Sequence, residues 1–212
     1  MYFSNGINSY ANLKTALANW LDRSDLTSRL DEFIELAEAR IADDLRIRAM
    51  ETTVTQALTG GTRSYALPTG YLQARNFQIN TDPITALEYI TPEMMDRIWA
   101  GSTSGRPSTY TILGDNYILG PSPDSADTLE ITYYKEFTAL SGSATTNWLI
   151  LNRPNIYLYA CLLEASPFLG SPEEAQVWAT FYQEAIDRIQ NADSRDRFSG
   201  SVLTVKTTAG NP

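Results

Sequence analysis

The amino-acid sequence predicts an α+β fold, mainly α: a helical bundle built from the N- and C-terminal helices, with a small antiparallel β domain inserted between them. Apolar residues recur at helical spacing near both ends of the chain, and short β-prone segments separated by turn signals fill the middle. Hydrophobic residues make up 43% of the 212 residues, enough for a sizeable core. We therefore expect residues 1–50 and 141–198 to form the bundle, 51–140 the inserted β-rich domain and 199–212 an extended C-terminal tail.

Two helices are expected near the N-terminus. The first, near residues 9–22, follows from an apolar stripe that includes Leu13, Leu17 and Trp20. After the polar segment DRSD, a second stripe predicts a helix over residues 28–48, with Thr27 as its N-cap.

The middle of the chain carries the strand signals. TTVTQAL and RSYAL, separated by TGGT, predict a hairpin, and ARNFQI and ITALEYI are further strand candidates. TYTIL and NYILG flank Gly114-Asp115-Asn116 and predict a second hairpin, while TLEITYYKEF alternates as a strand should. Thr91-Pro92-Glu93 is typical of a helix start, so a short helix is expected over 92–99.

Helices resume from Trp148. The segment NIYLYACLLEA is apolar nearly all round, which a helix accepts only at the centre of a bundle or an assembly. Pro167 and Gly170 should end or kink it. The segment SPEE from Ser171 then predicts a capping box and a last helix that runs to about residue 195.

No pattern in the sequence indicates a catalytic, cofactor-binding or metal-binding site, and we expect no cofactor. The chain contains no histidine, which excludes Ser-His-Asp and Cys-His nucleophile systems and most catalytic zinc sites. Its one cysteine, Cys161, lies in an apolar run and is expected to be a buried structural thiol. The longest uncharged apolar run, 156–163, is far shorter than the ~18–20 residues that span a bilayer, so no membrane partner is expected.

Carboxylates and arginines crowd the stretch DEFIELAEARIADDLRIRAMETT. On a helix, Glu32, Glu35 and Glu38 would spread over the side away from the apolar stripe, without converging on one point as a metal site or a glycosidase pair requires. They are therefore predicted to form a solvated acidic face.

A second set of charged residues in the same stretch lies beside the apolar stripe rather than opposite it. Arg40, Asp44 and Arg48 are spaced i, i+4, i+8, which predicts packing or subunit contacts rather than catalysis. Three aromatic residues of the last helix are candidates for the same kind of contact: Trp178, Phe181 and Tyr182.

The sequence resembles tailed-phage head-to-tail adaptor proteins, also called connector or head-completion proteins. The resemblance starts at WLDRSDLTSRLDEFIELAEARIADDLRIRAMETT and continues through YALPTGYLQARNFQI, ALEYITPEMM and GRPSTYTILGDNYILGPSPD. LEITYYKEFTALS, TNWLILNRPNIYLYACLLEASPFL and EEAQVWATFYQEAIDRIQNADSR follow in the same order. Together these segments cover nearly everything from about residue 9 to 198.

The resemblance implies a ring, usually dodecameric, that docks beneath the portal protein, extends the DNA channel and gives the tail its attachment platform. The implied partners are the portal protein, tail nozzle or other tail and connector proteins, and further copies of the chain. DNA would pass through the channel without specific binding. The protein would be made in the host cytoplasm and reside in the virion at the head–tail junction. The family supplies no catalytic motif to transfer.

The tail after Gly200 lies outside this resemblance. Its segment SVLTVKTT is β-prone and lacks helical periodicity, so it could add to a partner's surface as an extra strand. Val202, Leu203 and Val205 are therefore candidate portal-docking residues.

Two other functions stay open at this point. A peptidoglycan-lytic glycosidase acting at infection needs only two carboxylates, so the lack of histidine does not exclude it. A small DNA-binding assembly factor is disfavoured by the net charge of −9, because DNA affinity comes from Lys and Arg side chains that neutralise phosphates. The same acidity would let DNA pass through a channel without sticking.

Overall fold

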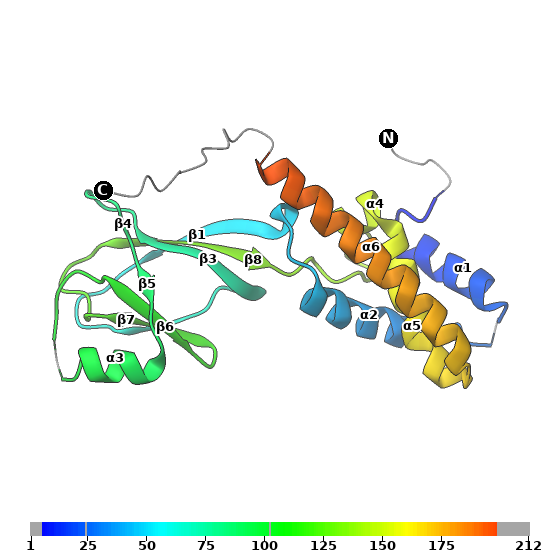
Figure 1. Ribbon diagram of the computed structural model, residues 1–212, viewed down its shortest axis with the longest axis horizontal. Helices are drawn as coiled ribbons and strands as arrows, with labels where there is room; N and C mark the ends of the chain where they lie inside the picture. Colours follow the sequence, from blue (N-terminus) through cyan, green and yellow to red (C-terminus); the bar gives the residue numbers. More distant parts are fainter. Residues whose placement is uncertain (1–5, 24, 102, 199–212) are drawn as a thin grey trace, which may run out of the picture. The chain divides into compact units, whose positions relative to one another are not determined.

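The computed structural model describes residues 6–23, 25–101 and 103–198. The candidate tail residues Val202, Leu203 and Val205 lie outside these ranges. The chain divides into two compact units (Figure 1). One comprises the chain up to Ile47 and from Leu140 onward, and the other is Arg48–Ala139. The predicted fold class, α+β and mainly α, is confirmed.

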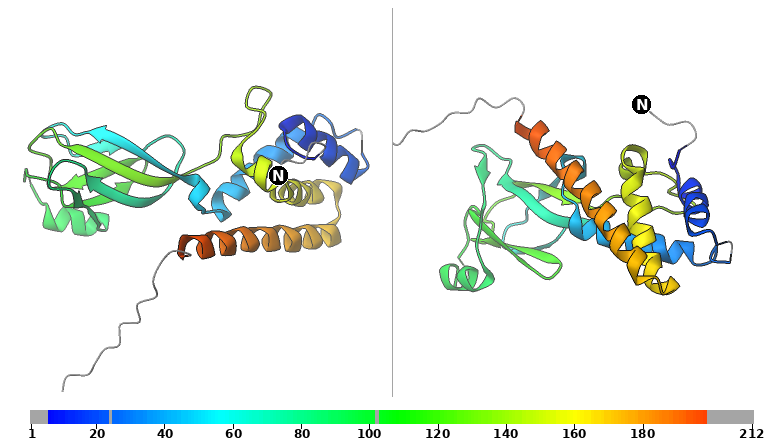
Figure 2. Two further views of the ribbon diagram at one scale, coloured as in Figure 1. Left: turned by 90° about the horizontal axis from the view of Figure 1, so that it is seen from above. Right: turned by 45° about the vertical axis from the view of Figure 1, so that its right-hand side comes forward.

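The first unit is helical and is organised around one apolar helix. Helix α5 (Pro154–Leu169) contacts each of the other helices of the unit, and its side chains are buried nearly all round. These partners are α1 (Tyr10–Leu21), α2 (Leu30–Asp44), α4 (Trp148–Asn152) and α6 (Pro172–Phe198). Figure 2 shows α6 along one side of α5, with α1 on the opposite side. The expectation that this segment lies at the centre of the bundle is confirmed.

Local sequence signals set several of the helix ends. Ser9 caps α1 by accepting a hydrogen bond from the Asn12 backbone N–H. Gly170 ends α5 in a left-handed conformation, with φ of 69°, which a glycine adopts without steric cost.

Both predicted ends of the second helix were wrong. The helix begins at Leu30, so Arg29 and not Thr27 occupies the cap position, and Arg29 makes no side-chain capping bond. It ends at Asp44 because Leu45 turns to an extended backbone, with φ of −101° and ψ of 127°. This conformation buries both Leu45 and Ile47. Arg48 is therefore not on the helix with Arg40 and Asp44 but begins the 3-10 helix η1 (Arg48–Met50) in the other unit.

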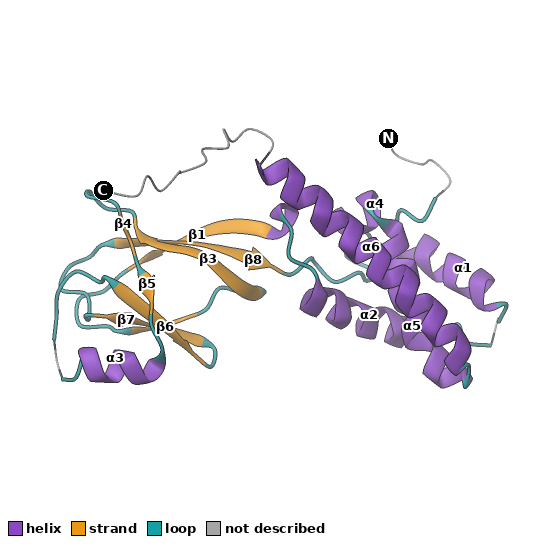
Figure 3. Cartoon of the chain, in the orientation of Figure 1, coloured by secondary structure: helices purple, strands orange, loops and turns teal. Residues whose placement is uncertain are grey.

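The second unit packs two small sheets around one core (Figure 3). The first has the strand order β1-β8-β3-β4 and the second β2-β7-β6-β5. Phe77 of the first sheet stacks on Tyr110 of the second, with ring centroids 4.1 Å apart. The strands are β1 (Glu51–Ala57), β2 (Ser64–Ala66), β3 (Tyr71–Ile79), β4 (Thr85–Ala86), β5 (Glu88–Tyr89), β6 (Thr109–Leu113), β7 (Asn116–Gly120) and β8 (Thr128–Lys135).

The later strand predictions hold. β6 and β7 form the expected hairpin, with Gly114 at a φ of 59° in its turn. β8 places Leu129, Ile131 and Tyr133 in the core, as its alternation predicts. The short helix α3 (Pro92–Ile98) begins as predicted, and the Thr91 hydroxyl caps it by accepting a hydrogen bond from the Met94 N–H.

The first predicted hairpin was wrong. TTVTQAL forms β1, which pairs along its whole length with β8, whereas RSYAL contributes β2, which pairs with β7 in the other sheet. The TGGT segment does turn, with the Thr62 N–H bonded to the Thr59 carbonyl, but it leads from one sheet to the other. In this pairing, Val54 of β1 packs against the shared core.

ITALEYI also does not form one strand. Its first part is β4, in the first sheet, and its second part is β5, in the second sheet, where it runs parallel to β6. Leu87 lies between them, is buried in the core and donates its N–H to the Phe77 carbonyl. The segment ITALEYI thus passes from one sheet to the other, and Leu87 fills the space between the two sheets.

A close approach of helix α3 to the second sheet leads to a stability prediction. Gly120 lies against the side chains of Trp99 and Met95, and a Cβ at this position would come within 2.7 Å of the Met95 sulfur. Gly120→Ala should therefore lower the free energy of unfolding by about 1–3 kcal/mol through overpacking. Gly60→Ala is the matched control, because its Cβ would meet nothing closer than 3.4 Å. Urea denaturation of the two variants checks this, and equal stability would contradict it.

A candidate interaction surface on the helical unit

Polar contacts join the three long helices of the helical unit. The Arg40 guanidinium of α2 forms an ion pair with Glu164 of α5. The Tyr182 hydroxyl of α6 donates to the Asp44 carboxylate at the end of α2 over 2.9 Å. The Gln190 amide donates to the backbone carbonyl of Asp44, also over 2.9 Å. Three of the predicted contact residues, Arg40, Asp44 and Tyr182, thus meet within one chain.

Of these contacts, the burial of Tyr182 contributes most. The Arg40 and Glu164 side chains keep 42% and 17% of their surface exposed, so their pair is worth about 0–1 kcal/mol. Tyr182 is 3% exposed, and burying an aromatic side chain of this size is worth about 1.5–3 kcal/mol. The position of α6 is therefore fixed mainly by the buried ring of Tyr182, whose hydroxyl is hydrogen-bonded to Asp44.

Glu38 departs from the solvated face on which it was predicted to lie. Its carboxylate accepts the Leu140 backbone N–H at 2.7 Å and the Tyr157 hydroxyl at 3.1 Å. The Tyr157 hydroxyl in turn accepts a hydrogen bond from the Asn147 side chain, whose own oxygen caps α4. Glu32 and Glu35 do lie on the exposed side, where Glu32 pairs with Arg29. The prediction was wrong for Glu38 because it follows buried Ala37 and sits at the edge of the apolar face.

Burial and the neighbouring carboxylates keep the tyrosines of this region neutral. Burial raises the pKa of Tyr157, and the nearby Glu38 carboxylate raises it further. Burial and then the Asp44 carboxylate raise the pKa of Tyr182 in the same way. Burial also raises the pKa of the Cys161 thiol, so this cysteine is an unreactive core residue, as expected.

Large apolar side chains gather on an exposed surface of α1, α5 and α6. Trp20 is 53% exposed, Val177 48% and Phe181 43%. The Trp178 ring lies 5.7 Å from Trp20 and 6.0 Å from Phe181, and Tyr159 of α5 lies 5.6 Å from Phe181. We call these five residues, Trp20, Tyr159, Val177, Trp178 and Phe181, the aromatic patch. The four aromatic rings lie close to one another, and Val177 precedes Phe181 by one turn of α6. A cluster of exposed and partly exposed large apolar residues is typical of a protein–protein contact surface.

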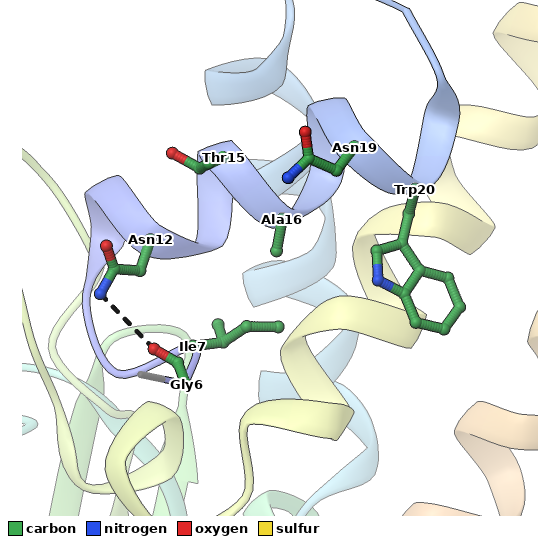
Figure 4. Close-up of a pocket in the computed structure, with 7 residues that line it drawn as sticks. All are labelled: Gly6, Ile7, Asn12, Thr15, Ala16, Asn19 and Trp20. Carbon is green, nitrogen blue, oxygen red and sulfur yellow. Dashed lines mark hydrogen bonds between the residues drawn. The ribbon is translucent and has the colours of Figure 1, made fainter. Parts of the chain in front are cut away.

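A hollow of about 490 Å³ lies beside α1 and ends at Trp20 of the patch (Figure 4). The Asn12 side chain donates to the Gly6 carbonyl on one side, and Ile7 extends beneath the helix. The lining contains neutral side chains alone: Gly6, Ile7, Asn12, Thr15, Ala16, Asn19 and Trp20. None of these side chains can exchange a proton near neutral pH, so the lining supplies no general acid or base.

The part of the chain that the structure describes carries no cluster of three or more His, Cys, Asp or Glu side chains that could hold a metal ion. Within the same residues, no helix combines the length and apolar character that crossing a bilayer requires.

Comparison with known families decides the identity. The SU10 adaptor protein family matches residues 8–205. The chain belongs to the SU10 adaptor protein family. This is a phage head–tail adaptor family, so the resemblance found in the sequence is confirmed, and the match continues past residue 198 into the tail. No curated protein matches the chain.

Membership of an adaptor family implies a structural, non-enzymatic protein that contacts other phage head or tail proteins. The predicted contact residues of this adaptor divide into two groups. Arg40, Asp44 and Tyr182 join helices inside the unit, while Trp178 and Phe181 belong to the aromatic patch. Trp20, which belongs to the apolar stripe that predicted α1, also joins the patch.

The two donors that meet at Glu38 yield a stability prediction. Glu38→Ala should lower the free energy of unfolding of the adaptor by about 1–3 kcal/mol, because the Leu140 N–H and the Tyr157 hydroxyl lose this acceptor. Glu35→Ala, one turn earlier on the exposed side of the same helix, should change it by less than about 0.5 kcal/mol. Urea denaturation measures both, and a Glu38 variant as stable as the Glu35 variant would refute this role.

The buried tyrosines predict instability in alkali. Tyrosine in an unfolded chain has a pKa of about 10. In the fold, partial burial raises the pKa of Tyr71 of the β unit to about 12, and fuller burial raises the pKa of Tyr157 and Tyr182 of the helical unit. Below pH 10 both states are protonated. From pH 10 to 12 the unfolded state loses protons first, so the free energy of unfolding should fall by about 1.4 kcal/mol per pH unit for each fully buried tyrosine.

Urea denaturation at a series of pH values from 8 to 12 measures this fall. Tyr182→Phe removes one of the buried hydroxyls and should make the decline shallower. A free energy of unfolding that stays constant to pH 12 would show that the tyrosines titrate freely in the folded state.

Proposed function

We propose that this adaptor is a structural virion protein that forms a ring, expected to be dodecameric, and docks under the portal protein. The ring extends the DNA channel and provides the attachment platform for the tail nozzle or other tail and connector proteins. The protein is made in the host cytoplasm and resides at the head–tail junction. The observation that carries the proposal, beside the family match to residues 8–205, is the aromatic patch.

The patch suits a subunit contact because its position on the helical unit is fixed. Trp178 and Phe181 lie on α6, the helix that Tyr182 ties to Asp44. A patch on an anchored helix loses little conformational entropy when a partner covers it, unlike one on a free loop.

The size of the patch favours assembly on a template over spontaneous assembly in solution. Covering the exposed halves of Trp20, Val177 and Phe181 is worth roughly 1 kcal/mol each. Two proteins that associate lose about 4–15 kcal/mol of translational and rotational free energy. The patch alone does not offset that loss, but a portal ring that holds neighbouring copies together makes each later contact intramolecular.

The net charge of −9 fits passage of DNA through the ring. Carboxylates repel phosphates, so an acidic channel neither binds the duplex nor slows its movement.

The decisive measurement is sedimentation of the purified adaptor alone and with its portal protein. We expect a monomer alone and a ring on the portal. Trp20→Ser combined with Phe181→Ser should abolish the ring while leaving the fold intact, since both side chains are half exposed. Gln183→Ser is the control on an exposed position of α6 outside the patch.

An adaptor that never joins the portal would overturn the proposal, and so would a patch variant that still assembles. The glycosidase alternative is tested in parallel by adding the purified protein to peptidoglycan. Lysis that disappears when the exposed Glu32 and Glu35 are replaced together, with Glu38 kept because it supports the fold, would favour the enzyme.

A further inference from the structure

Two strands of the first sheet have an open side, and they differ. β4 covers β3 (Tyr71–Ile79) at Gln78 and Ile79 alone, but the uncovered part of β3 carries the charged Arg75 and two register shifts, which interrupt further pairing. Beyond Glu51, β1 has neither protection.

Among the described residues, three of the four sheet edges are short strands: β2 has three residues, and β4 and β5 have two each. The fourth, β1, has seven residues and pairs on one side alone, with β8. Short edge strands are a common way of preventing unwanted pairing, whereas a long edge strand is a template for another chain.

β1 also lacks the residues that usually protect an edge. From Thr52 to Ala57 it carries neither charge nor proline. Its one charged residue, Glu51, pairs with Arg75 on β3, 3.3 Å away. From Thr52 onward the strand is therefore uncharged and free of proline.

The register shows which backbone groups face the open side. The Leu58 N–H bonds to the Asp127 carbonyl, so residues of the same parity along β1 direct their backbone groups to β8. Thr53 and Thr55 have the opposite parity, and their N–H and C=O groups point away from the sheet. Both are exposed, and the described residues include no partner for these groups. The Ala57 carbonyl, by contrast, is taken by the Gln56 side chain.

We propose that β1 is a docking edge and that its occupant is the tail segment 202–207, VLTVKT, of a second copy of the chain. Residues 199–212 follow the last residue of α6, and this segment has neither proline nor glycine. It alternates so that Leu203 and Val205 share one face. Added beside β1, that face extends the core next to Val54, which β1 leaves half buried.

We assign the tail to a second copy of the chain because the tail segment and the β1 edge are two different surfaces. A tail that binds the edge of the next copy makes a heterologous contact, and such contacts close into rings when the rotation between copies allows. A tail that pairs with the β1 of its own chain would link nothing. The inference goes beyond the proposed function, because it gives the tail a partner other than the portal.

Engineered disulfides test the pairing in the full-length protein with its portal. One preparation carries Thr53→Cys, a second carries Thr204→Cys, and a third carries Lys206→Cys to cover the neighbouring register. Each tail variant is mixed with the edge variant and oxidised. We expect a disulfide between chains on a non-reducing gel. The native Cys161 is fully buried and does not compete.

Blocking the edge gives the matched comparison. Thr55→Pro in the edge chain removes an N–H that points away from β8, so the sheet persists but the edge no longer donates there. It should lower the crosslink at least about tenfold. Thr55→Val keeps the N–H and should leave the crosslink unchanged. Thr62→Cys in place of Thr53→Cys, on the exposed turn beyond β1, should give no crosslink.

A crosslink between chains that Thr55→Pro removes supports the inference. Its absence in a preparation that sediments as a ring on the portal overturns the inference and leaves the proposed function standing. A crosslink that is insensitive to Thr55→Pro also overturns it. Failure of the wild-type chain to join the portal is a failure of the proposed function instead.

Discussion

The burial of α5 on nearly every side is the constraint on which the rest of the structure depends. A helix that is apolar all round has no face to offer to water, so it needs neighbours in every direction. The chain supplies them from both of its ends, with α1 and α2 before the β unit and α4 and α6 after it. The β unit therefore has to leave the helical unit and return to it, which makes it an insertion. Glu38 marks the return by accepting the N–H of Leu140, the first residue after the insertion.

The polar residues of the helical unit and its exposed aromatic residues act together. Arg40, Asp44 and Tyr182 lie where α2, α5 and α6 meet, and Tyr182 adds a buried ring to its hydrogen bond. With α6 anchored this way, the aromatic patch keeps its shape before any partner arrives. Covering the patch alone does not offset the free energy that two proteins lose on association, which agrees with the proposed assembly on a portal template.

The β unit forms its core between two sheets and limits the length of most of its edge strands. Crossing segments such as ITALEYI place Leu87 between the sheets instead of extending one sheet. Those crossings leave most edge strands only two or three residues long. β1 keeps its full length because it pairs with the long central strand β8. Short edge strands elsewhere, and the charge and register shifts of β3, leave β1 as the edge that we propose for strand addition.

The sequence by itself determined the features that depend on local chemistry. The cap at Thr91, the turn at Gly114 and the all-round apolar character of α5 were predicted, because a hydroxyl, a left-handed glycine and an apolar run act within a few residues. The order of helices, strands and helices also predicted the fold class. Only the tertiary structure decided that β1 pairs with β8, that Arg48 leaves its helix and that Glu38 binds Leu140 and Tyr157. In each case, residues far apart in the sequence bury apolar surface or satisfy buried donors, and these energies exceed the local preferences that periodicity reports.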